Sequence, residues 1–144
     1  MGESDVSFAR LERDGAERFQ RLRAQLGVSA FGMNLIVLQP GQRSRIHAHT
    51  QQEEVYLVLE GELTLLVAGE EHLLGSDQLA RVGHEVRRQL LNAGPDRLVL
   101  LALGGYGDHE GRDGLAWTSW EDSGPGMPPA DVPLPDDLGA GSAH

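Results

Sequence analysis

The chain has 144 residues, no cysteine and a formal net charge of −10 at pH 7. This length predicts one domain, the lack of cysteine excludes disulfides and thiolate metal ligands, and the acidic balance argues against nucleic acid or an anionic membrane as a partner. All 12 basic residues are arginine, which excludes a Schiff-base lysine and suggests a GC-rich, bacterial genome. No apolar run is long enough for a membrane helix and the first residues do not resemble a secretory signal, so we expect a cytoplasmic protein.

A short amphipathic helix is predicted over about residues 15–26. The spacing of residues 14–17 resembles a capping box, and Gly27 is a typical helix stop. Apolar residues recur at i, i+3 and i+7, at Phe19, Leu22 and Leu26. We expect this helix to pack over one end of the domain; a dimer contact is the alternative.

From residue 30 onward, short apolar runs alternate with turn residues. The predicted strands cover residues 31–38, 45–49, 54–59, 63–67, 72–74, 77–82, 86–91 and 98–103. Many short strands with no intervening helix are typical of a sandwich or barrel.

The chain therefore divides into an N-terminal segment (1–29), a β-barrel (30–105) and an irregular C-terminal extension (106–144). Residues 115–120 are expected to form a short strand or a docked segment. Residues 121–144 are acidic and proline-rich, and we expect an extended tail. Three apolar residues are expected to lay this tail partly on the barrel: Val132, Leu134 and Leu138.

The most informative stretch carries two histidines two positions apart, followed by a carboxylate. Residues i and i+2 of a strand point to the same face, so His47 and His49 would present two imidazoles side by side. Glu54 follows after a short turn and could return an oxygen from the next strand. Two imidazoles and a carboxylate suit a divalent transition metal, with positions left open for a substrate.

The spacing G-x5-H-x-H-x4-E-x6-G over residues 41–61 resembles the first conserved motif of the cupin family. In cupins the two histidines and the glutamate are metal ligands, and the register selects Glu54 over Glu53 because Glu54 lies seven positions before Gly61. The resemblance implies an all-β, single-domain cupin (jelly-roll) barrel, here with a short N-terminal helix and the irregular tail. It also implies a metal such as Fe, Mn, Ni or Zn, and a homodimer.

The second cupin motif, roughly G-x5-P-x-G-x2-H-x3-N, matches less well. When residues 75–92 are aligned on Asn92, the position of the usual fourth ligand holds Arg88. A shift of one residue would instead turn Arg87 inward, and His84 is a candidate substitute ligand. A unit charge about 5 Å from a dication repels it by roughly 6–7 kcal/mol at an effective dielectric near 20. Structural zinc binding is worth on the order of 10–16 kcal/mol, so Arg88 would weaken metal binding without abolishing it.

Two functions remain open. In the first, the chain is a metal-dependent enzyme of dioxygenase, isomerase or decarboxylase type, and Arg88 orients an anionic group of a small organic molecule. In the second, it is a metal-free module that binds or senses a small molecule, and Arg88 pairs with Glu54 in place of the fourth ligand.

Two further residues are substrate-binding candidates. Tyr56 shares the facing direction of Glu54 and would be a hydrogen-bond donor in the cavity, or else an amphipathic core residue. Arg45 has the parity of His47 and could lie at the mouth of the barrel.

Overall fold

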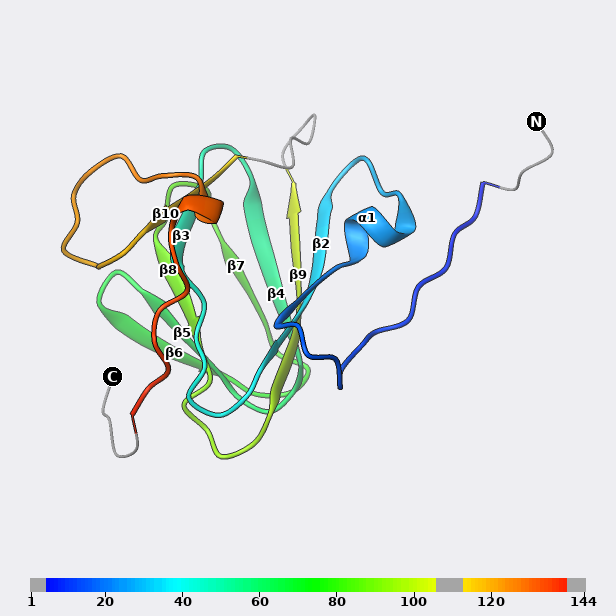
Figure 1. Cartoon of the computed structure of the whole chain (residues 1–144), viewed down its shortest axis with the longest axis horizontal. Helices are drawn as coiled ribbons and strands as arrows, with labels where there is room; N and C mark the ends of the chain where they lie inside the picture. Colours follow the sequence, from blue (N-terminus) through cyan, green and yellow to red (C-terminus); the bar gives the residue numbers. More distant parts are fainter. Residues whose placement is uncertain (1–4, 106–112, 140–144) are drawn as a thin grey trace.

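The protein is built almost entirely of antiparallel strands (Figure 1). The computed structural model describes residues 5–105 and 113–139. One sheet contains, in spatial order, β1 (Phe19–Arg21), β2 (Gly32–Leu38), β9 (Leu98–Gly105), β4 (Glu53–Glu60) and β7 (Leu79–Val82). The other contains β10 (Gly114–Trp117), β3 (Ile46–His49), β8 (Arg88–Leu91), β5 (Leu63–Val67) and β6 (Glu70–Leu74). The prediction of an all-β, jelly-roll type of fold is confirmed.

The interior between the two sheets is filled by the inward-facing residues of both. Side chains alternate between the two faces of a strand, so Tyr56 and Val58 of β4 and Leu90 of β8 meet in one apolar cluster. Burying this apolar surface is the main source of stability for such a barrel. The interior is therefore a packed core over most of its length, and the polar site lies among the few inward-facing residues that are not apolar.

The outer face of the first sheet is covered by the N-terminal segment. Helix α1 (Leu22–Leu26) packs its buried Leu22 against Leu35, Val37 and Val99. The helix is shorter than predicted, because residues 19–21 pair with β2 as a strand. The predicted capping box is also wrong: the N-cap is Arg21, and no side chain caps the helix. The predicted stop at Gly27 is confirmed, with φ of 74°.

The outer face of the second sheet is covered by the C-terminal extension, which runs along the other side of the barrel in Figure 1. Strand β10 pairs with β3, and the 3-10 turn η1 (Pro129–Asp131) follows. As predicted, the tail lies partly on the barrel: Val132 is buried, and the amide of Leu138 donates to the carbonyl of Gly41 at 2.8 Å. Within the described ranges, no helix is both long and apolar enough to cross a bilayer.

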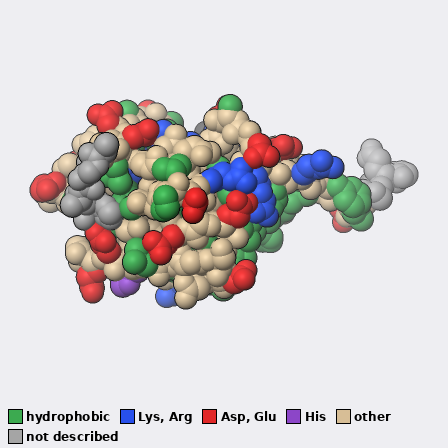
Figure 2. Space-filling model, turned by 90° about the horizontal axis from the view of Figure 1, so that it is seen from below, with side chains coloured by type: hydrophobic (Ala, Val, Ile, Leu, Met, Phe, Trp, Pro, Cys, Tyr) green, Lys and Arg blue, Asp and Glu red, His purple; other side chains and the backbone are tan. Residues whose placement is uncertain are grey.

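The N-terminal arm, residues 5–10, leads away from the barrel (Figures 1 and 2). Two of its apolar side chains are exposed, Val6 by 63% and Phe8 by 87%.

Candidate metal centre

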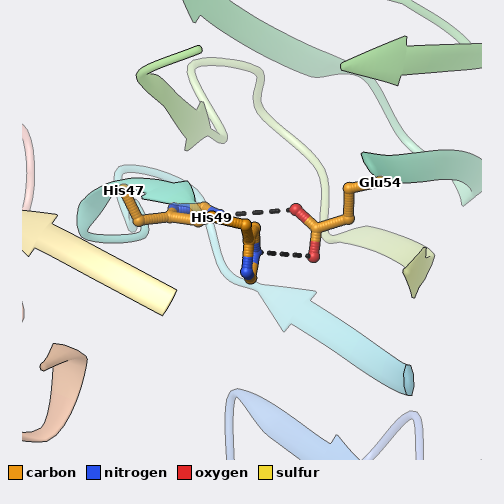
Figure 3. Close-up of side chains that lie close together, drawn as sticks. All are labelled: His47, His49 and Glu54. Atoms are coloured by element: carbon orange, nitrogen blue, oxygen red, sulfur yellow. Dashed lines mark ion pairs between the residues drawn. The ribbon is translucent and has the colours of Figure 1, made fainter. Parts of the chain in front are cut away.

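The two histidines and the glutamate of the first motif converge inside the barrel (Figure 3). His47 and His49 extend from β3 and Glu54 from the neighbouring part of β4, and one ligand atom from each lies within 4.8 Å of the others. The Nε2 atom of His47 is 3.5 Å from Oε1 of Glu54, and that of His49 is 3.4 Å from Oε2. The side chains are between 13% and 17% exposed, so a small molecule can reach them.

Local chain geometry explains why Glu54, and not Glu53, joins this group. Strand β4 begins at Glu53, and alternation turns Glu54 inward. Glu53 is exposed and pairs with Arg81 on the outer surface, with Nε and Oε1 2.5 Å apart. Further on, Gly61 has φ of +77°, and a side chain there would collide with the carbonyl of Arg97. The motif's final glycine is thus a steric requirement of the turn after β4.

The hydrogen bonds behind the two imidazoles fix which nitrogen faces Glu54. Nδ1 of His47 lies 3.0 Å from the carbonyl oxygen of Arg45, and Nδ1 of His49 lies 2.9 Å from Oδ1 of Asp113. A carbonyl and a carboxylate only accept hydrogen bonds, so each Nδ1 carries the proton. In the neutral form of each ring, Nε2 then directs a lone pair toward the carboxylate of Glu54.

This arrangement fits a cation. Two nitrogen lone pairs and a carboxylate repel one another unless a proton or a metal ion lies between them. Nε2 of His49 is buried and has no hydrogen-bond partner in the described part of the chain. Histidines that bind metals commonly donate their other N–H to a carbonyl or carboxylate. The donor set therefore suits a divalent transition metal.

Asp113, which the sequence did not single out, ties the metal-ligand candidates to the C-terminal extension. Besides His49, it accepts hydrogen bonds from the backbone amides of Gln51 at 3.0 Å and Gln52 at 2.8 Å, and from the side chain of Gln52. One buried carboxylate thus holds both His49 and the turn that leads to Glu54. The sole sequence signal was its position just before the predicted segment 115–120.

Arg88 occupies the position opposite His47 and is completely buried. Its Nη1 donates to the carbonyl of Val86 at 2.8 Å, and its Nη2 lies 3.6 Å from Oε1 of Glu54. Nε and Nη2 have no hydrogen-bond partner among the residues described. Arg87 lies on the outer face, 3.9 Å above the ring of Trp117. The alignment on Asn92 therefore gave the correct register.

Tyr56 belongs to the same polar group. Its hydroxyl donates to Oε1 of Glu54 and lies 3.4 Å from Nε2 of His47. The side chain is fully buried and also contributes to the apolar core. Both readings of the sequence thus apply to one residue, because the ring packs in the core while the hydroxyl reaches the site.

The structure does not bring the two other site candidates to this group. His84 is exposed in the turn before β8, where Glu85 has φ of 66°. Arg45 precedes β3, which begins at Ile46, so strand alternation does not set its direction. Its Nε donates to the carbonyl of Val132 at 2.6 Å, and it lines a groove of about 460 Å³ between the second sheet and the tail.

Burial and charge shift the pKa values of three residues in the site. Burial alone would raise the pKa of Glu54, but hydrogen bonds and charge attraction to His47 and His49 outweigh it and hold the pKa well below its usual range. Burial lowers the pKa of His49, yet the attraction of Glu54 and Asp113 for the protonated ring leaves the pKa raised. Burial, and then the charge of Glu54, raise the pKa of Tyr56 well above its usual value, so its hydroxyl remains a proton donor.

Comparison with known families points to one group of proteins. A family model described as "Cupin domain" matches residues 34–104. A polyketide synthase protein, CurC, from Streptomyces cyaneus is 29% identical over 85 residues, which are 59% of this chain and 55% of the relative. The match thus spans only about half the length of that relative.

Solved structures agree with the fold. A cupin protein from Bacteroides fragilis superposes with a TM-score of 0.65 at 20% identity, covering 76% of this chain and 92% of the other. A putative sugar phosphate isomerase from Acidithiobacillus ferrooxidans gives a TM-score of 0.55 at 27% identity, covering 60% of this chain and 56% of the other.

Proposed function

The chain belongs to the cupin superfamily, and from that premise we propose that it binds a divalent transition metal through His47, His49 and Glu54 and acts on a small anionic molecule. The observation that carries the proposal is the convergence of two Nε2 lone pairs and one carboxylate within 4.8 Å. Three protein ligands are the number typical of catalytic metal sites, which keep a position open for substrate.

The reaction we favour is of isomerase type, ahead of a dioxygenase or a decarboxylase. The similar chain from Acidithiobacillus ferrooxidans is described as a putative sugar phosphate isomerase, and an isomerase needs only a Lewis acid and groups that hold or move protons. A metal here would polarise a substrate oxygen. Arg88 would hold an anionic group, and Tyr56 would keep a proton at its hydroxyl to donate to a substrate oxygen.

Metal analysis of untagged protein tests the proposal. The protein is loaded separately with iron, manganese, nickel and zinc, and metal is measured by elemental analysis after gel filtration. We expect about one equivalent of the preferred metal in the wild type, consistent with a single three-ligand site. His47→Ala should abolish it while circular dichroism stays unchanged. His72→Ala is the matched control, since His72 is exposed on β6. Wild-type protein that takes up no metal would rule the function out.

A metal-free binding function is the second candidate, and the position of Arg88 favours it. Its Nη2 lies 3.6 Å from Oε1 of Glu54, so the arginine already supplies one positive charge to the carboxylate. In that case a small anion would raise the melting temperature equally with and without a chelator. Under the metal function, the chelator would remove most of the shift.

We further propose a cytoplasmic homodimer, with the barrel at residues 30–105 as its ligand-binding unit and residues 1–29 and 106–144 as flanking segments. The exposed Val6 and Phe8 of the N-terminal arm support a contact with a second copy. Light scattering after size-exclusion chromatography tests it: Phe8→Ser should shift the dimer toward monomer, and a monomeric wild type would exclude it.

A further inference from the structure

The guanidinium of Arg88 has hydrogen-bonding capacity that the described residues do not use. The side chain is completely buried, and a single hydrogen bond, from Nη1 to the carbonyl of Val86, holds it. Nη2 is 3.6 Å from Oε1 of Glu54, so this edge of the guanidinium faces the site. Nε and Nη2 both lack a hydrogen-bond partner within the described ranges. Buried donors are normally satisfied, which indicates that a ligand completes this residue.

The charge balance of the site indicates what kind of ligand that is. Glu54 and Arg88 contribute one negative and one positive charge and cancel. Asp113 adds a further negative charge, but it lies behind the ring of His49, at Nδ1. A dication held by His47, His49 and Glu54 would therefore leave about two positive charges in front of that ring, in a largely buried place.

We propose that this site, if it holds metal as proposed above, takes up the metal together with a small doubly negative oxyanion that Arg88 binds. The planar guanidinium presents two parallel N–H groups to a carboxylate or a phosphate. One oxyanion therefore satisfies Nε and Nη2 of Arg88 and cancels the excess charge of the metal. A singly charged or neutral molecule does only part of this.

The two binding events are then coupled. Without the anion, Arg88 repels the metal; with the anion, the repulsion becomes attraction through the shared ligand. Thermodynamic linkage requires each partner to raise the affinity of the other by the same factor. Because of Arg88, the metal binds tightly only when a doubly negative oxyanion is also bound.

Titration calorimetry of Mn²⁺ into chelator-treated protein tests the coupling. Titrations are made without added anion and with malonate, methylphosphonate or acetate at matched ionic strength. For the wild type, at least one of the two dianions should lower the Kd of Mn²⁺ by about tenfold or more, within the usual range of coupling between sites. Acetate should change it by less than about threefold, because one charge cancels only half the excess. The stronger dianion tells whether the natural ligand carries two carboxylates or a phosphate.

Three variants assign the coupling to Arg88. Arg88→Gln removes a like charge, so Mn²⁺ alone should bind at least about tenfold more tightly, and the dianion effect should fall to about twofold or less. Arg88→Lys keeps the charge but loses the planar fork, so it should bind Mn²⁺ as the wild type does and lose most of the dianion effect. Arg87→Gln is the matched control, since Arg87 lies on the outer face over Trp117, and it should behave as the wild type.

The outcomes separate this inference from the proposed function. Suppose that Mn²⁺ binds and that the dianion effect is as large in Arg88→Gln and Arg88→Lys as in the wild type. This result would overturn the role of Arg88 but not the metal site. Failure of Mn²⁺, and of the other metals tested above, to bind to any variant would overturn both. If circular dichroism shows that Arg88→Gln does not fold, the dianion effect in Arg88→Lys decides whether Arg88 is responsible for the coupling.

Discussion

The strand pair β3–β8 has two faces that are built in opposite ways. On the inner face, His49 and Arg88 keep polar atoms that no described residue satisfies. On the outer face, the polar side chains find partners in the C-terminal extension. Oε1 of Gln89 accepts from Trp120 at 3.3 Å, and Arg87 donates to the carbonyl of Gly124 at 3.4 Å.

The difference separates structural polar groups from functional ones. Both faces carry buried polar side chains, so burial alone does not identify a site. An outer-face group that finds its partner within the chain stabilises the fold. An inner-face group without one costs stability, which is typical of residues that await a ligand. Mutations on the outer face should therefore lower stability and leave metal binding unchanged, whereas mutations of the inner-face polar groups should also change binding.

Trp117→Ala should produce the largest loss of stability from the outer face. Trp117 is 7% exposed, stacks under Arg87 and donates from Nε1 to the carbonyl of Gly124 at 2.8 Å. Truncating a buried tryptophan costs about 3–5 kcal/mol. Chemical denaturation should show this loss, while the Kd for metal of the folded protein stays within about twofold, because the side chain faces away from the ligands. Loss of metal binding without loss of stability would contradict the comparison.

Glu54→Gln should lower stability from the inner face. The carboxylate is the charge partner of Arg88, and removing one member of a buried pair leaves an uncompensated charge at a cost of about 3 kcal/mol. The double variant Glu54→Gln/Arg88→Gln should recover much of the lost stability. Denaturation of the wild type, the two single variants and the double variant in chelator gives the interaction energy between Glu54 and Arg88. No recovery would mean that the pair, 3.6 Å apart, does not interact.

The inner face was the more predictable of the two. His47, His49 and Glu54 lie within eight positions, and strand alternation turns each of them inward. The packing of the two sheets then brings Glu54 of β4 against the histidines of β3. Arg88 came from a weaker motif but lies within a strand, where register and alternation again decide. The fold followed from the same short-range pattern of apolar runs and turns.

What the sequence did not predict depends on long-range contacts. Asp113 bonds to His49 across 64 positions, and no local pattern encodes that distance. Arg45 has the parity of His47 and was expected at the mouth of the barrel, but it precedes the strand and binds the tail instead. The helix lost residues 19–21 because pairing with β2 overrides the local helical period.

Asp113→Asn should weaken metal binding without unfolding the barrel. Asparagine keeps the shape but no longer offers two negative oxygens to His49 and the amides of Gln51 and Gln52. Loss of such a partner of a metal-binding histidine costs about 10–100-fold in affinity. Calorimetry measures this change, with Asp131→Asn, an exposed residue of η1, as the matched control. Equal affinities for the two variants would contradict the role of Asp113.

The metal-free protein should be most stable at mildly acidic pH. Burial acts to raise the pKa of Asp113, but hydrogen bonds from Gln52, His49 and Gln51 outweigh it and lower the pKa. The contribution of Asp113 to stability is therefore present above its unfolded pKa and is lost as pH falls through its folded pKa. Burial acts to lower the pKa of His49, but Glu54 and Asp113 outweigh it and raise the pKa. The contribution of His49 to stability is therefore present below its unfolded pKa and is lost as pH rises through its folded pKa. Melting temperatures across pH in chelator should therefore pass through a maximum, and Asp113→Asn should flatten both sides.

Arg87→Gln should have the smallest effect, and it tests whether the outer face is purely structural. Arg87 stacks on Trp117 with 3.9 Å between the guanidinium carbon and the ring centroid, an interaction worth about 0.5–1 kcal/mol at a partly exposed site. Glutamine removes the stacking and the bonds to the extension, so the free energy of unfolding should fall by about 1 kcal/mol. Arg81→Gln is the control; its exposed pair with Glu53 should be worth less than about 0.5 kcal/mol.

The same Arg87→Gln protein carries a second expectation, because Arg87 directly precedes Arg88, the first residue of β8. If the two faces are independent, loosening Arg87 from the extension leaves Arg88 in place, since Arg88 is held by the carbonyl of Val86 and by Glu54. Metal affinity would then be unchanged. A change in metal affinity comparable with that of Arg88→Gln would mean that the extension positions β8, and that the outer face controls the inner one.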